Sequence, residues 1–224
     1  MNNYRYELKY ILEEFNHSEL DLFLIKNKIK KSYPCRKVNS LYFDELDYTS
    51  VKDNLSGIGK RKKIRLRWYD NNIEPFLEIK IKNSKLGHKE KIKIESLKNV
   101  DINKLTAREL FYEVNNSIKR FDNSLELNTM LFPNLKVSYQ RNYFETKNNL
   151  RVTIDDQIKF NIVNLNQEVD HFKQINYYNK ILEIKFNRDL FNFSQNLISD
   201  FGIRPQRMSK YLLGLSQFGL VEYT

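Results

Sequence analysis

Two copies of one charged motif are the strongest chemical signal in this sequence. Leu-Glu-Ile-Lys occurs at residues 77–80 and again at 182–185, and a shorter Glu-Leu-Lys occurs at 7–9. Residues two apart on a β-strand point to the same face, so each motif would place a carboxylate and an ammonium about 6–7 Å apart. The acid could bind a divalent metal and the base a phosphate oxygen, because Mg²⁺ commonly takes one or two carboxylates and lets substrate phosphates complete its shell.

Basic residues surround these motifs at the same spacing of two. Residues 59–93 are typical of three strands in which cations alternate with apolar residues. The bases expected on one face of these strands are Lys63, Arg65, Arg67, Lys80, Lys82, Lys89, Lys91 and Lys93. Like charges on neighbouring strands repel, so this face favours an anionic ligand. The alternatives are a polar face that only meets solvent, or a ladder of salt bridges, for which the bases have too few acidic partners.

The spacing of the apolar residues predicts the elements that carry these side chains. Further strands are expected over residues 4–12, 38–43, 135–144, 151–155, 158–163 and 181–186, with turns at 70–72 and 148–149. Helices are expected over residues 18–31, before Pro34, and over 106–121, 190–201 and 208–218. Thr106 and Glu109 form the capping box of the second helix. Residues 44–59 are predicted to be a turn-rich crossing with a short helix, and residues 164–179 an irregular connection.

A closed or nearly closed antiparallel barrel would reconcile the charged and apolar faces. Helices would cover the apolar faces from outside, and the charged faces would line a channel. The predicted fold class is therefore α+β, a β-barrel tunnel with a charged interior and flanking helices. A length of 224 residues with 41% hydrophobic content suits one large domain over residues 1–224.

Composition narrows the class of partner and the compartment. A formal net charge of +10 favours polyanionic partners such as polyphosphate, nucleic acid or anionic lipid. Nucleic acid is disfavoured because Trp68 and most strand aromatics alternate opposite the cations, where bases could not stack on them. The single cysteine, Cys35, excludes an internal disulfide. No apolar run long enough to span a bilayer and no signal peptide is found, so a cytoplasmic protein is expected.

The ordered set of motifs resembles the VTC domain of polyphosphate polymerases, which belongs to the triphosphate tunnel metalloenzymes. The resemblance extends from the first strand to the last helix. It is carried by RYELKY at 5–10, SLYFD at 40–44, KIRLR at 63–67, FLEIK at 76–80, YQR at 139–141, LRVTID at 150–155, ILEIKF at 181–186 and SKY at 209–211. It implies a tunnel that binds ATP with Mn²⁺ or Mg²⁺ and transfers the γ-phosphoryl group to a growing polyphosphate chain.

The resemblance also implies roles for individual residues. The catalytic set is Lys9, Arg65, Arg67, Lys80 and Glu183. Phosphate contacts are expected from Lys9, Arg65, Arg67, Lys80, Lys91, Arg141, Arg151 and Lys210, and from Lys63 and Lys185 on the same charged faces. The metal is expected on Glu183, with secondary or orienting roles for Glu7, Glu78 and Asp155.

One position departs from the pattern of the hydrolytic members of that superfamily. Those members carry two acids before the lysine of the first strand, and Arg5 occupies the first of these positions here. The departure argues against a two-metal triphosphatase and leaves polymerase chemistry as the leading hypothesis. A tripolyphosphate or nucleoside triphosphate hydrolase, and a non-catalytic polyphosphate-binding module, are the alternatives. Eukaryotic polymerases of this kind also carry a regulatory domain and membrane helices, so coupling to a membrane would require a membrane-protein partner.

Overall fold

The computed structural model describes residues 5–69, 74–83, 86–121, 130–171, 173–199 and 201–223. The chain forms two compact units, each assembled from three segments. Unit 1 comprises Met1–Lys37, Tyr139–Ile158 and Asn176–Ser209, and unit 2 comprises Val38–Ser138, Lys159–Ile175 and Lys210–Thr224. Three long strands contribute residues to both units: β2 (Lys30–Asp44), β6 (Phe132–Glu145) and β7 (Arg151–Ile162).

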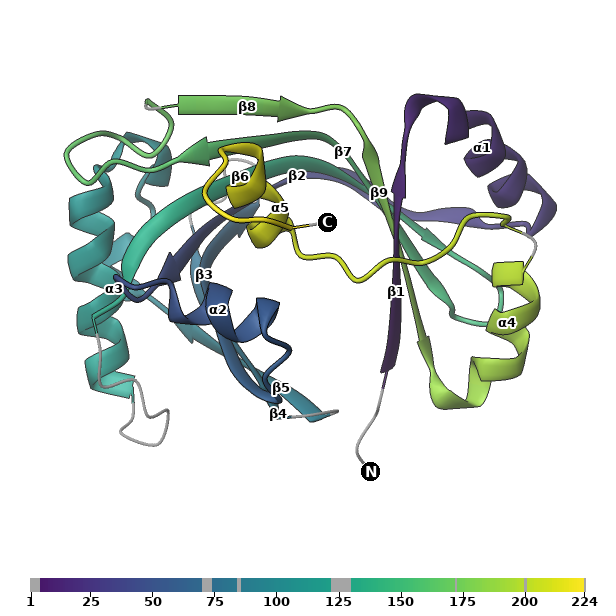
Figure 1. Ribbon diagram of the computed structural model, residues 1–224, viewed down its shortest axis with the longest axis horizontal. Coiled ribbons are helices and arrows are strands. Elements are labelled where there is room, and N and C mark those ends of the chain that lie inside the picture. The colour runs from purple at the N-terminus through teal and green to yellow at the C-terminus, as the bar shows by residue number, and fades with distance from the viewer. Residues whose placement is uncertain are drawn as a thin grey trace. The chain divides into compact units, whose positions relative to one another are not determined.

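Nine strands make up the sheet in the described part of the chain. The other six are β1 (Arg5–Leu12), β3 (Lys60–Tyr69), β4 (Phe76–Asn83), β5 (Leu86–Lys93), β8 (Lys173–Tyr177) and β9 (Lys180–Asn187). Their order is β1-β9-β7-β6-β2-β3-β4-β5, with β8 paired to β7 (Figure 1). The ladders β1–β9, β7–β9, β2–β3, β3–β4 and β4–β5 are antiparallel. The predicted α+β class with an antiparallel sheet is confirmed, and closure of the sheet into a barrel stays a prediction.

In unit 1, two helices cover the apolar face of β1, β7 and β9. These are α1 (His17–Lys26), which follows the short helix η1 (Glu14–Asn16), and α4 (Phe191–Ser199), which follows η5 (Arg188–Leu190) (Figure 1). Their buried core includes Tyr10, Leu20, Phe23, Val152, Ile154, Leu182, Ile184, Leu197 and Phe201. Each such side chain contributes about 1.5–3 kcal/mol when fully buried, and this burial fixes which face of the strands remains for the charges.

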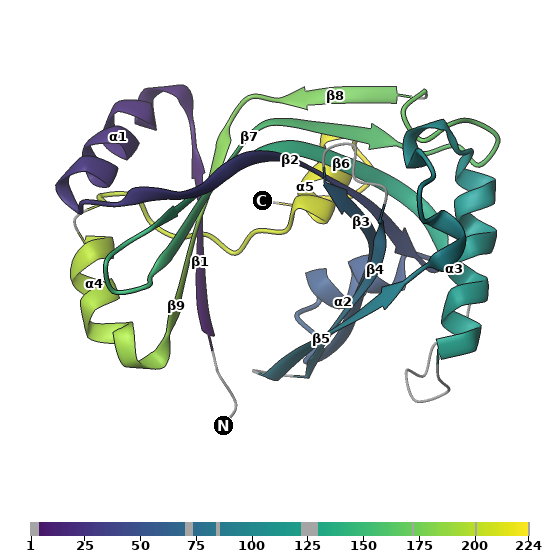
Figure 2. The same ribbon diagram turned by 180° about the vertical axis from the view of Figure 1, so that it is seen from behind.

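In unit 2, α3 (Ala107–Phe121) packs on the apolar face of β2 to β5, and α5 (Lys210–Gln217) lies on the other face (Figure 2). The predicted capping box of α3 is confirmed, because Thr106 N donates to Glu109 Oε2 at 2.8 Å and Glu109 N donates to Thr106 Oγ1 at 3.3 Å. The core includes Leu41, Ile64, Leu66, Trp68, Leu77, Ile79, Leu110 and Val114. The predicted short helix in the crossing is α2 (Thr49–Leu55), and η2 (Glu95–Leu97) and η3 (Ile102–Lys104) precede α3.

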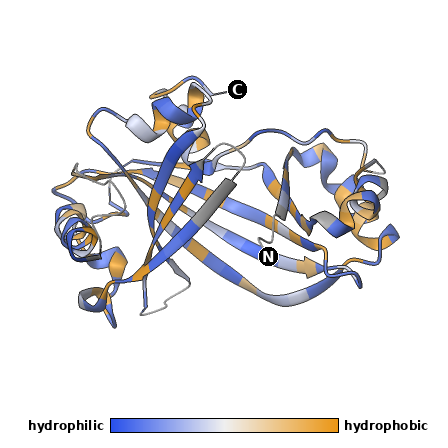
Figure 3. Ribbon diagram, turned by 90° about the horizontal axis from the view of Figure 1, so that it is seen from below, coloured by the Kyte–Doolittle hydropathy of each residue, from blue (hydrophilic) through white to orange (hydrophobic). Residues whose placement is uncertain are grey.

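Hydrophobic and hydrophilic residues alternate along the strands, as Figure 3 shows in colour. This alternation is why the strands of residues 59–93 were predictable. The turn predicted at residues 70–72 lies outside the described residues, and so does Tyr4 of the first predicted strand. None of the described helices is long and apolar enough to cross a membrane.

The predicted helix over residues 18–31 is wrong at its end. Helix α1 stops at Lys26, Lys28 takes a positive φ of 52°, and β2 begins at Lys30, so Pro34 lies inside a strand. Leu22 and Ile25 have helical spacing within this range, but their side chains are 68% and 74% exposed, so they form no buried stripe.

Two further strand predictions are wrong in extent. Residues 151–155 and 158–163 were expected to be separate strands, whereas β7 is continuous from Arg151 to Ile162, with a positive φ of 49° at Gln157. Residues 164–179 were expected to be irregular but include β8. None of the five residues of β8 is buried, so this strand lacks the buried face that marks a half-buried strand.

Candidate functional site

Glu78 is the centre of the charged face of unit 2. It is 2% exposed and lies on β4 directly opposite Arg65 of β3. Arg65 donates to Glu78 Oε2 from Nε at 2.7 Å and from Nη2 at 2.5 Å, Arg67 Nη1 lies 3.7 Å away, and Lys89 forms a third ion pair. Burial would raise the pKa of Glu78, but Arg65, Arg67 and Lys89 outweigh it and lower the pKa to about 2. Glu78 is therefore ionised and orients three bases.

Strand β2 adds hydroxyl groups to this face. Tyr42 lies opposite Arg65, and Ser40 lies opposite Arg67. Arg65 Nη1 donates to Tyr42 Oη at 3.2 Å, and Arg67 Nε donates to Ser40 Oγ at 3.1 Å. Sequence reasoning treated residues 38–43 as a short apolar strand and missed both residues. The signal was present, because Ser40 and Tyr42 alternate with Leu41 and Phe43.

Lysines extend the charged face across β3, β4 and β5. Lys63 is opposite Lys80, and Lys80 is opposite Lys89, so three lysines form one row across three strands. Opposed like charges destabilise a sheet unless an anion lies between them. Lys91 is opposite Glu78, and its Nζ lies 4.6 Å from the centroid of the Phe76 ring. The row contains two of the predicted phosphate ligands, Lys63 and Lys80, and a third, Lys91, lies opposite Glu78.

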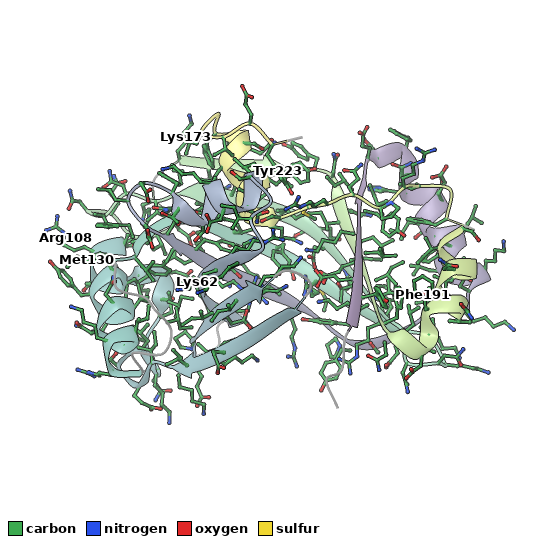
Figure 4. The ribbon with its side chains drawn as sticks, turned by 60° about the horizontal axis from the view of Figure 1, so that its bottom comes forward. Lys62, Arg108, Met130, Lys173, Phe191 and Tyr223 are labelled. Carbon is green, nitrogen blue, oxygen red and sulfur yellow. The ribbon has the colours of Figure 1, made fainter. Side chains whose placement is uncertain are left out.

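The cations near Lys63 divide between the two faces of β3. Lys62, labelled in Figure 4, pairs with Ile81 and therefore shares the face of Ile64 rather than that of Arg65. Lys210, far from β3 in the sequence, is the first residue of α5, and its positive charge lowers the pKa of Tyr42. The structure therefore places Lys210 in unit 2, where its charge reaches Tyr42.

Asp155 and Arg141 form the buried pair of the charged face of unit 1. Asp155 is fully buried on β7, and Arg141 on β6 binds it with two hydrogen bonds, Nε to Oδ1 at 2.6 Å and Nη2 to Oδ2 at 2.7 Å. Arg141 Nη2 also lies 3.8 Å from Glu183 Oε2, and its guanidinium lies 5.2 Å from the centroid of the Tyr139 ring. This bidentate grip fixes the plane of the guanidinium.

The other predicted residues of unit 1 alternate in sign on β1, β9 and β7. Lys9 pairs with Glu183 across the β1–β9 ladder, and Glu7 pairs with Lys185. Within their own strands, Glu7 Oε1 lies 2.8 Å from Lys9 Nζ, and Glu183 forms an ion pair with Lys185. Lys9 Nζ also donates to Met208 O at 3.2 Å. Arg151 of β7 is exposed and lies opposite Lys185 of β9, so it extends this charged face at its edge.

The acids of these faces limit how a metal could be held. Among the described residues, no group of three or more His, Cys, Asp or Glu side chains is placed to hold a metal ion. Glu78 and Asp155 are engaged by arginines, which suits an orienting role. Glu183 and Glu7 lie on adjacent strands and on one face, two residues out of register with each other. The donor chemistry of two carboxylates would suit a Mg²⁺-like ion that takes one or two carboxylates and completes its shell with phosphate oxygens.

The predicted residues thus lie in two sets, one in each unit, and each set lies on the sheet face opposite the hydrophobic core. The unit 2 set is Lys63, Arg65, Arg67, Glu78, Lys80 and Lys91, with Lys210 on α5. The unit 1 set is Glu7, Lys9, Arg141, Arg151, Asp155, Glu183 and Lys185. Each set combines buried carboxylates with arginines and more exposed lysines, an arrangement suited to binding phosphate groups.

We compared the chain with known proteins and structures. The search of curated proteins gives no match. Among solved structures, a proposed adenylate cyclase from Vibrio parahaemolyticus is 13% identical, with a TM-score of 0.55 and coverage of 96% of this chain and 99% of that one. A Pyrococcus horikoshii protein is 15% identical, with a TM-score of 0.54 and coverage of 96% and 99%. A proposed adenylyl cyclase from Hippeastrum, described as having a dominant triphosphatase activity, is 14% identical, with a TM-score of 0.52 and coverage of 96% of both chains.

At these identities the likeness shows a shared fold. The sequence itself matches the VTC domain family over residues 4–218, nearly the whole chain. The resemblance stated from the motifs is thereby confirmed. The chain belongs to the VTC domain family.

Proposed function

We propose that the protein is a metal-dependent phosphotransferase that moves the γ-phosphoryl group of ATP onto a growing polyphosphate chain. Members of the triphosphate tunnel family are enzymes that act on triphosphates and generally depend on a divalent metal. The observation that carries the proposal is the pairing of buried acids with arginines, Glu78 with Arg65 and Asp155 with Arg141. Phosphoryl transfer depends mainly on positioning and charge neutralisation, which such fixed arginines can supply.

The roles of the bases follow from their chemistry. In unit 2, Arg65 and Arg67 would grip phosphate oxygens through their planar donor groups, and Lys80 and Lys210 would add point charges. In unit 1, Arg141 and Lys9 would have the same two roles. A terminal phosphate oxygen of the polyphosphate chain would form a new bond to the γ-phosphorus, while the bond from that phosphorus to the β,γ-bridging oxygen breaks and ADP leaves. The attacking oxygen is already ionised near neutral pH, so the step requires no general base.

Glu183, with Glu7 beside it, is the proposed holder of the metal. A bound Mn²⁺ or Mg²⁺ would withdraw negative charge from the triphosphate. The ion pairs of Glu183 with Lys185 and Arg141 keep its carboxylate on the charged face. A neutral amide at this position would keep the shape and lose most of the affinity for a divalent cation.

Incubation with ATP and Mn²⁺, followed by gel analysis of polyphosphate, tests the proposal. The wild type should produce polymer, and Glu183→Gln should lose most of this turnover. Glu14→Gln, an exposed acid in the same unit, is the matched control and should retain activity. Free phosphate without polymer would indicate a hydrolase. Tight polyphosphate binding that is unaffected by Glu183→Gln, with no turnover, would indicate a binding module.

A further inference from the structure

Tyr42 lies on the charged face of unit 2, and the SLYFD motif that contains it implied no role for its hydroxyl. We propose that Tyr42 binds the triphosphate directly, donating its hydroxyl hydrogen to a phosphoryl oxygen, and that Tyr211 of α5 is the positioning residue that holds the Tyr42 ring in place. The inference rests on the proposed function, because it adds a neutral donor and an aromatic support to the same phosphate site.

The hydrogen bonding of Tyr42 leaves its own hydrogen available. Arg65 Nη1 donates to Tyr42 Oη at 3.2 Å, so the phenol oxygen acts as an acceptor in this contact. Arg65 is the hydrogen-bond partner of this phenol within the described part of the chain. A hydroxyl that accepts a hydrogen bond can still donate one. Its hydrogen is therefore free for an anion that Arg65 also contacts.

The charges around Tyr42 suit an anionic acceptor. Burial would raise the pKa of the Tyr42 phenol, but the positive charges of Arg65, Arg67 and Lys210 outweigh it and lower the pKa. A phenol with a lowered pKa is a stronger hydrogen-bond donor. Arg65 and Arg67 come from β3 and Lys210 from α5, so the charges of cations from two elements act on one phenol.

Tyr211 fixes the ring of Tyr42 by stacking. The two ring centroids are 4.9 Å apart with an interplanar angle of 13°. Tyr211 is 2% exposed, donates its hydroxyl hydrogen to Asp44 Oδ2 at 3.1 Å and accepts from Asn134 Nδ2 at 3.3 Å. Asp44 in turn accepts hydrogen bonds from the backbone N–H groups of Glu45 and Ser50, both at 2.9 Å. The supporting ring is therefore held at both its face and its hydroxyl.

The position of α5 is itself tightly defined. A Cβ on Gly214 would lie 2.5 Å from Leu135 Cδ2 and 2.6 Å from Phe160 Cδ1, closer than real side chains pack. Gly214 thus lets α5 approach β6 and β7 closely enough for Tyr211 to reach Tyr42. Lys210 directly precedes Tyr211, so the same placement brings its charge to the phenol.

Equilibrium binding of tripolyphosphate, measured by isothermal titration calorimetry, tests the role of Tyr42. Tyr42→Phe keeps the stacked ring and removes the donor, so affinity should fall by about tenfold, the effect of one hydrogen bond to a charged group. Tyr112→Phe removes an exposed hydroxyl on α3 and should bind like the wild type. Thermal unfolding checks that each variant is folded.

Two double variants separate direct binding from support of other residues. In an Arg65→Ala background, Tyr42→Phe should weaken binding further, whereas no further loss would mean that Tyr42 only positions Arg65 and would overturn the proposal. Tyr211→Leu should weaken binding in the wild type but not in the Tyr42→Phe background, because its effect passes through that hydroxyl. An equal loss in both backgrounds would overturn the positioning role.

The binding measurement is independent of turnover. If the wild type binds tripolyphosphate but makes no polymer from ATP, the proposed polymerase function fails while the role of Tyr42 remains measurable. If Arg65→Ala loses affinity and Tyr42→Phe does not, the inference about Tyr42 alone is overturned.

Discussion

At the scale of single residues, buried acids decide how the bases are presented. Glu78 makes ion pairs with Arg65, Arg67 and Lys89 and is almost completely buried. An acid in this position is strongly stabilised in its ionised form, since its pKa is lowered from 4.5 to about 2. Its removal would leave Arg65 and Arg67 half-buried or buried without their counter-charge, which is costly. Glu78 is thus expected to stabilise the fold as well as orient the phosphate ligands.

Glu78→Gln should lower the free energy of unfolding at neutral pH by about 3 kcal/mol, as the lowered pKa implies. Because the pKa is lower in the folded state than in the unfolded state, this stabilisation is fully present above pH 4.5 and is lost as the pH falls toward 2. Urea unfolding of the wild type and the variant at several pH values measures the difference. Glu95→Gln, an exposed acid on η2, is the control. A difference that persists unchanged at low pH would contradict this account.

At the scale of elements, the position of α5 depends on one close approach. A methyl group on Gly214 would clash with the side chains of Leu135 and Phe160, at 2.5 Å and 2.6 Å. Overpacking of this kind typically destabilises a protein by about 1–3 kcal/mol. It would also displace Tyr211 and Lys210, which share the helix.

Gly214→Ala should therefore lower both the unfolding free energy, by about 1–3 kcal/mol, and the affinity for tripolyphosphate. Gln217→Ala, an exposed position on the same helix, should change neither by a measurable amount. Denaturant unfolding and calorimetry give the two quantities. Normal stability and binding in Gly214→Ala would show that α5 tolerates displacement and does not position the charged face.

The strands that carry the candidate site could be predicted from the sequence, because residues such as Arg65, Arg67 and Glu78 alternate with a buried apolar set. The face on which each charged residue lies follows from this phase alone. Individual partners do not, because they depend on the exact register between strands: nothing in the sequence fixes the pairing of Tyr42 on β2 with Arg65 on β3. The end of α1 and the existence of β8 were not predicted, because neither segment has a regular pattern of buried apolar residues. Leu22 and Ile25 of α1 are exposed, and no residue of β8 is buried.

At the scale of the whole molecule, the net charge of +10 draws anions to a surface where many bases are exposed. Interactions of exposed charges are screened by salt beyond about 10 Å at 0.1 M ionic strength, whereas buried pairs are screened much less. The buried pairs of Glu78 and Asp155 should therefore persist when the attraction of polyphosphate weakens.

Affinity for polyphosphate should fall strongly between about 0.05 M and about 0.5 M NaCl, while the unfolding free energy changes little. Lys80→Ala should reduce the slope of affinity against salt, because Lys80 is exposed within the charged row. Lys98→Ala removes an exposed charge outside this row and should leave the slope nearer to that of the wild type. Fluorescence titration with labelled polyphosphate provides the measurement. Equal slopes for both variants would mean that only the net charge matters.

The phosphorus balance of the reaction tests the central claim most directly. ³¹P NMR of the wild type with ATP and Mn²⁺ resolves ADP, orthophosphate and the internal phosphates of a chain in one sample. Transfer to polyphosphate predicts that internal phosphate signals grow in step with ADP and that little orthophosphate appears. ADP accompanied by an equal amount of orthophosphate, or no consumption of ATP by folded, metal-loaded protein, would contradict it.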